Sequence, residues 1–173
     1  PLLFIFTTVV IIPFVIGIAY SFIEWDGIPA NPKIFVGFDN YVKLMQDQRF
    51  LASAGITVLF TLLSLVAVNV LGLLFSLIVT SGLKTSNAAR TMLFMPNLIG
   101  GLILGYIWQF IFTDAFKMLG ESTGWNGLFF NWLLNPQYAL IAIVVVFTWQ
   151  MAGYTMVIYI AGILSIPQHY YEA

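Results

Sequence analysis

Uncharged polar side chains within long apolar stretches are the residues of this chain best suited to handling a ligand. Gln150 and Tyr154 are four residues apart and would share one face of a helix, with Trp149 beside them. An amide can hydrogen-bond hydroxyl groups, and aromatic rings present a flat apolar surface to C–H groups. This combination suits a neutral polyhydroxyl compound. We therefore predict that these three residues lie along the path of such a solute, with helix packing as the alternative.

Two asparagines raise the same question. Asn69, Gly72 and Ser76 follow one another at spacings of three and four, so they share a helix face, and Asn97 lies in another apolar stretch. Both asparagines are candidates for the same path. The alternative is that they form hydrogen bonds between helices, each worth about 0.6–2 kcal/mol.

Residues for enzymatic chemistry are missing from the sequence. It has no cysteine and a single histidine, His169, and its net charge is −1. Metal sites and acid–base pairs need several convergent groups, and ion-coupled carriers depend on charged residues inside the membrane. We therefore predict no enzyme activity, no metal site and no proton-coupled mechanism. The lack of a basic excess argues against nucleic acid as a partner.

The composition determines the class of element that carries these residues. The chain is 61% hydrophobic and 8% charged, whereas soluble domains are roughly 45–50% apolar and about 25% charged. A helix needs about 20 apolar residues to cross a membrane. We therefore predict an all-α, polytopic transmembrane helical bundle in one domain, residues 1–173. Its four predicted spans cover about 1–23, 51–80, 91–113 and 138–164.

The connections between the spans predict the orientation. The short segment 81–90 carries Lys84 and Arg90 without an acidic residue. Because positive charge in short loops marks the cytoplasmic side, this segment is predicted to lie inside. The longer segments 24–49 and 114–137 then lie outside, the first with a short amphipathic helix around Tyr41, and the C-terminal residues return to the cytoplasm.

Several short motifs occur in an order that resembles a known family. They are Gly-Phe-Asp-Asn-Tyr at 37–41, Met-Pro-Asn at 95–97, Thr-Trp-Gln at 148–150 and Ile-Pro-x-x-Tyr-Tyr-Glu-Ala at 166–173. In this order they resemble the membrane-spanning permease subunits of binding-protein-dependent ABC importers, within the sugar-uptake group. The resemblance implies the type I importer permease fold.

The C-terminal motif has a specific role in that family. By resemblance, Glu172 and Ala173 begin the cytoplasmic coupling helix that contacts the ATPase, and Pro167, Tyr170 and Tyr171 set its exit from the membrane. Pro167 fits this role physically, because proline cannot continue a helix. Since the chain begins without Met and stops within the motif, we interpret it as an internal piece of a longer protein.

The resemblance also implies partners. These are ABC ATPase subunits that bind the ATP, a second permease subunit that forms a homologous heterodimer, an extracytoplasmic solute-binding protein and the lipid bilayer of a bacterial-type cell membrane. This chain itself would need no cofactor. The same fold could import another solute, such as an amino acid, a peptide or phosphate. A non-ABC channel or secondary carrier is a further alternative, disfavoured by the absence of charge within the spans.

Overall fold

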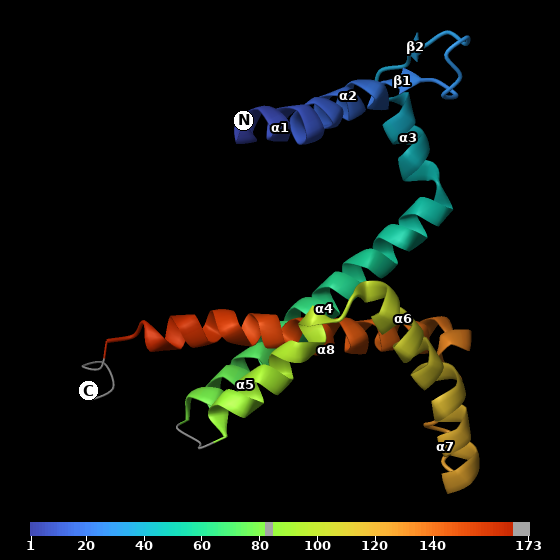
Figure 1. Cartoon of the computed structure of the whole chain (residues 1–173). Helices are drawn as coiled ribbons and strands as arrows, with labels where there is room; N and C mark the ends of the chain where they lie inside the picture. Colours follow the sequence, from blue (N-terminus) through green and yellow to red (C-terminus); the bar gives the residue numbers. More distant parts are fainter. Residues whose placement is uncertain (82–84, 168–173) are drawn as a thin grey trace. The chain divides into compact units, whose positions relative to one another are not determined.

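The computed structural model describes residues 1–81 and 85–167, and helices dominate it (Figure 1). Four helices are long and apolar enough to cross a membrane: Leu2–Ser21, Gln48–Thr80, Gly101–Thr123 and Pro136–Leu164. The predicted all-α class with four spans is thereby confirmed. The chain divides into two compact units, Pro1–Gly55 and Ile56–Ala173. Each is described by itself below, and the assignment of residues 1–173 to one domain stays a prediction.

The first span consists of α1 (Leu2–Phe6), the π-helical η1 (Thr7–Ile11) and α2 (Ile12–Ser21). The widened turn comes just before Pro13, whose ring would clash with the carbonyl of Val9 in a regular α-helix. None of the span's residues is buried. Its apolar side chains are therefore available to lipid or to other chains.

The segment after the first span folds into a small ordered module. Two short antiparallel strands, β1 (Ile23–Glu24) and β2 (Ile34–Phe35), precede the helix α3 (Asp39–Gln46). The side-chain amide of Asn40 donates to the carbonyls of Ser21 and Ile23, at 3.0 and 3.1 Å. The predicted amphipathic helix around Tyr41 is present, and the ring of Tyr41 packs on that of Phe22, with ring centres 5.6 Å apart.

Lys33 contacts two aromatic rings next to the connection between the strands. Its Nζ lies 4.8 Å from the ring centre of Tyr20 and 4.6 Å from that of Trp25, and these two rings stack. In the same connection, the backbone N–H of Ile28 and the side-chain amide of Asn31 donate to Asp26 and hold the pKa of that carboxyl below its usual value. The connection is thus held by cation–π and charge-assisted contacts.

The long helix α4 (Gln48–Thr80) leads into the second unit. There follow α5 (Ser86–Phe94), the 3₁₀ turn η2 (Met95–Leu98), α6 (Gly101–Phe110), the π-helical η3 (Ile111–Ala115), α7 (Phe116–Thr123), the 3₁₀ turn η4 (Trp132–Leu134) and α8 (Pro136–Leu164).

The third span differs from its prediction. No single helix covers 91–113, because the chain leaves the helical conformation at Ile99 and Gly100, where ψ is 126° and 136°. The membrane-length helix instead runs over Gly101–Thr123. The prediction followed the stretch without charged residues, whereas the helix continues through charged side chains near its end.

The core of the second unit lies where α4, α5 and α8 meet (Figure 1). Val79, Met156 and Ile160 are buried there against Phe75, Ala89 and Leu93. Glycine permits this close approach. A Cβ built on Gly153 would overlap the carbonyl oxygen of Leu93, and one on Gly72 would come within 2.9 Å of the Thr155 side chain.

Aromatic rings join α6–α7 to the start of α8. Phe112 stacks on Trp132 with ring centres 5.4 Å apart, and Phe116 meets Trp132 edge to face at 5.2 Å. The side chain of Asn135 accepts from the backbone N–H of Gln137 and caps α8. This joint positions α6 beside α8, where the candidate site lies.

Candidate functional site

Gln150 lines a hollow of about 310 Å³ between α6 and α8. Gly105, Gln109 and Phe112 contribute from α6 and η3, because spacings of four and three place them on one helix face. Trp108 and Phe147 add aromatic walls. The hollow therefore combines two amides with aromatic surfaces, the arrangement that hydroxyl and C–H groups of a polyol can use.

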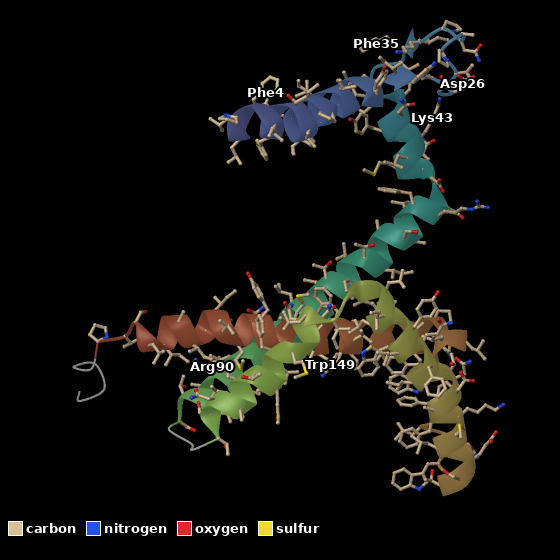
Figure 2. All side chains as sticks on the ribbon, viewed as in Figure 1. Phe4, Asp26, Phe35, Lys43, Arg90 and Trp149 are labelled. Atoms are coloured by element: carbon tan, nitrogen blue, oxygen red, sulfur yellow. The ribbon has the colours of Figure 1, made fainter. Side chains whose placement is uncertain are left out.

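The structure separates the three residues predicted together on α8. Trp149 does not line this hollow but contacts its wall, edge to face with Trp108 at a ring distance of 5.4 Å (Figure 2 labels Trp149). Tyr154 is 51% exposed on the surface of α8. Gln150 thus faces a cavity, Trp149 supports its wall, and Tyr154 faces outward from this unit.

Asn69 lies in a second hollow, of about 380 Å³, between α4 and α8. Its amide nitrogen donates to the carbonyl of Leu65 at 2.7 Å, and its oxygen accepts from the hydroxyl of Tyr159 at 2.8 Å. The Asn69 side chain therefore joins two helices, which is the packing alternative considered from the sequence.

Asn97 also contacts α8. Its amide nitrogen lies 3.9 Å from the sulfur of Met151, and Met151 lines the same hollow as Asn69. A thioether is a weak acceptor, so this contact leaves the amide largely free to bind another group.

Two polar residues of this region were not among the path residues predicted from the sequence. Gln109 shares the first hollow with Gln150, and its spacing from Gly105 and Phe112 was a usable signal. Ser64 lines the second hollow, and its buried hydroxyl oxygen has no hydrogen-bond partner among the described residues. A lone serine within an apolar helix gives no such signal, since serine usually bonds to its own helix.

The two hollows are electrically neutral. Among the described residues, none of those lining either hollow is charged. Nor does the described part of the chain hold a group of three or more histidine, cysteine or acidic side chains placed for a metal ion. The described lining residues of both hollows therefore offer a ligand hydrogen bonds and apolar contact but no charged partner.

The predicted coupling residues lie mostly outside the described residues. Tyr170, Tyr171, Glu172 and Ala173 are among those that the structure does not describe. Pro167 is exposed three residues after α8 ends at Leu164, and the Ser165 hydroxyl donates to the carbonyl of Gly162 at 2.7 Å. The helix therefore ends where the sequence places a proline.

Comparison with known proteins identifies relatives along the whole chain, although no family model matches it. One relative is the probable starch degradation products transport system permease protein AmyD of Thermoanaerobacterium thermosulfurigenes. The two sequences are 45% identical over 175 residues, and the alignment covers 100% of this chain and 58% of the relative. The chain is also 31% identical to the multiple sugar-binding transport system permease protein MsmF of Streptococcus mutans, over 91% of this chain and 54% of the relative. This chain is a homologue of sugar ABC importer permeases. It spans little more than half the length of these relatives.

The fold of the permease homologue matches solved importers. A chain in the crystal structure of a bacterial ABC transporter involved in the import of the acidic polysaccharide alginate aligns with a TM-score of 0.81 at 23% identity, covering 99% of this chain and 58% of that one. A second alginate transporter structure, in complex with an alginate pentasaccharide-bound periplasmic protein, gives a TM-score of 0.75 at 24% identity, over 98% and 56%. The predicted ABC importer permease fold is confirmed.

Proposed function

We propose that this chain forms part of a membrane permease subunit of an ATP-driven ABC importer, with a sugar or related polyol as its solute. The observation that carries the proposal is the 45% identity, along the whole chain, to a permease named for starch degradation products. The four membrane-length helices supply the bilayer-spanning part.

The candidate site favours a neutral solute within this family. Relatives also include sn-glycerol-3-phosphate permeases, at 28% identity for that of Agrobacterium fabrum, and the structural neighbour imports an acidic polysaccharide. An anionic solute in a low-dielectric site needs a cationic partner. Neither hollow offers one among its described lining residues. The two amides and the rings around Gln150 fit a neutral sugar ring instead.

The proposed mechanism gives this chain a passive chemical role. Gln150, with Gln109, would exchange hydrogen bonds with solute hydroxyls, while Trp108 and Phe147 would present apolar surface to the sugar ring and Trp149 would hold the Trp108 ring in place. Residues 167–173 would transmit movement from separate ATPase subunits, which bind and hydrolyse the ATP. A solute-binding protein and a second permease subunit would complete the assembly in a bacterial cell membrane, and this chain would catalyse no reaction itself.

The test is uptake by cells that carry the full-length gene with its partner subunits. We expect deletion to abolish uptake of a labelled glucose oligosaccharide, and unlabelled neutral sugars to compete with it where amino acids, peptides and phosphate do not. Competition by one of the latter would assign the same fold to another solute. Uptake that survives ATP depletion would overturn the proposal in favour of a channel or secondary carrier.

A further inference from the structure

Arg90 has no ion-pair partner among the described residues and lies beside an apolar groove. It lies in α5, and its Nε is buried without a hydrogen-bond partner among the described residues (Figure 2 labels Arg90). The described acidic residues of this unit are Asp114 in η3 and Glu121 in α7. Both follow the helix interruption at Ile99 and Gly100, whereas Arg90 precedes it. A partly buried guanidinium left unpaired is costly, so a group beyond the described residues of this unit is expected to neutralise it.

The groove beside Arg90 is long and almost wholly apolar. It has a volume of about 410 Å³ and is lined by Thr91, Phe94, Met95 and Leu98 from α5 and η2, and by Val157 from α8. From Arg90 to Leu98 it covers nine residues, which rise by roughly 14 Å at about 1.5 Å per residue in α5 and about 2.0 Å in η2. That is close to the depth of one leaflet of a hydrocarbon core about 30 Å thick.

Arg90 lies in α5 directly before the stretch without charged residues at 91–113, a position that fits the headgroup region. The segment before it is the one predicted to face the cytoplasm, and helical side chains tilt toward the helix N-terminus. The guanidinium of Arg90 therefore reaches toward the cytoplasmic surface while its carbon stem stays among apolar groups. The cytoplasmic leaflet carries anionic lipids, and basic pockets between helices bind their headgroups.

We propose that Arg90 and the groove between α5–η2 and α8 form a binding site for an anionic phospholipid, with the phosphate on the guanidinium and one acyl chain along Phe94, Leu98 and Val157. The charge of Arg90 selects a lipid over an apolar protein segment, since a segment without an acidic residue would leave the guanidinium unpaired. The site does not depend on which solute the protein transports.

The experiment measures lipids that stay bound to the full-length transporter complex, purified from mixed phosphatidylglycerol and phosphatidylcholine with identical acyl chains, by native mass spectrometry. The wild-type complex should retain phosphatidylglycerol preferentially. Arg90→Gln should lower this preference about five-fold, which corresponds to about 1 kcal/mol for one basic residue near the membrane surface. Val157→Trp keeps the charge but fills the groove, and should reduce retention of the same lipid.

Arg49→Gln is the matched control, because Arg49 is exposed near the opposite, predicted outer end of a span. It should leave the preference unchanged. The proposal is overturned by a wild-type complex without preference, by equal losses in both arginine variants, or by full displacement of the lipid with inorganic phosphate. It is also overturned if Arg90→Gln separates the subunits while lipid retention is unchanged, since a partner chain would then cover the groove.

Discussion

Two amide side chains from similar apolar stretches have different surroundings in the fold. Asn69 uses both its nitrogen and its oxygen in hydrogen bonds, one of them to Tyr159 on another helix. The Gln150 amide faces a hollow, and the described residues provide it with no hydrogen-bond partner. At the scale of single residues, Asn69 therefore has a packing role, and Gln150 is the better candidate for contact with a solute.

Replacing Gln150 with Leu should weaken uptake and leave the protein assembled. One lost hydrogen bond is worth about 1 kcal/mol, or roughly a five-fold rise in the solute concentration for half-maximal uptake. The measurement is uptake kinetics of the full-length transporter, together with its amount in the membrane. Gln137→Leu, at an exposed amide at the start of α8, is the control. Unchanged kinetics in Gln150→Leu would assign that residue to packing.

Replacing Tyr159 with Phe should loosen the contact between α4 and α8. The hydroxyl that donates to Asn69 is removed, at an expected cost of about 0.6 kcal/mol and at most about 2. Unfolding of the purified protein in detergent measures this cost, and combining the change with Asn69→Ala isolates the pair. Tyr106→Phe, at a 68% exposed tyrosine, should cost nothing. Additive effects in the double variant would show that the bond contributes no stability.

At this scale the sequence predicted which residues share a face, but not their partners. Asn69 and Gly72 indeed both face α8, since Asn69 bonds Tyr159 and Gly72 lies against Thr155. Tyr159 lies 90 positions from Asn69 along the chain. Helical spacing acts only within one element, so a contact between elements this far apart could not be derived from it.

At the scale of elements, composition predicted the first, second and fourth spans better than the third. Hydropathy identifies stretches that tolerate lipid, and it does not report backbone breaks. Pro96 removes one backbone donor, and the chain turns out of the helix at Ile99 and Gly100. Interrupted helices within membranes are acceptable where neighbouring protein surrounds them, and α8 packs on this turn.

Gly153 controls how closely α8 approaches the end of α5. A methyl group at this position would overlap the backbone carbonyl of Leu93, which cannot swing aside as a side chain would. Gly153→Ala should therefore destabilise the protein by about 1–3 kcal/mol, the usual cost of overpacking. Gly162→Ala on the same helix has nothing within 4 Å of the new carbon and serves as control. Equal thermal stability of the two variants would argue against this close contact.

At the scale of the whole molecule, apolar surface dominates even away from any core. The first span has no buried residue, and only 28% of the most apolar window of α4 and of α8 is buried. Such surfaces are stable only against lipid or against other chains. A chain that spans little more than half of its relatives and leaves this much surface uncovered is expected to work within a larger membrane assembly.

The coupling motif makes a prediction about that assembly. By resemblance, Glu172 begins the helix that contacts the ATPase, and it lies outside the described residues. Glu172→Lys in the full-length transporter reverses the charge at this contact, and should reduce uptake roughly ten-fold or more, within the usual range of coupling between sites. ATP hydrolysis by the partner subunits should lose its stimulation by solute, while the amount of permease in the membrane stays constant.

Glu121→Lys is the matched control for that prediction, because Glu121 is an exposed acid in α7 on the predicted outer side. It should transport normally and keep solute-stimulated hydrolysis. A loss of membrane-inserted protein in Glu172→Lys would identify a folding defect instead, and normal uptake by that variant would remove Glu172 from the coupling contact. Only loss of transport with intact insertion and unstimulated hydrolysis supports coupling, because it separates the transmission of ATPase movement from the building of the pore.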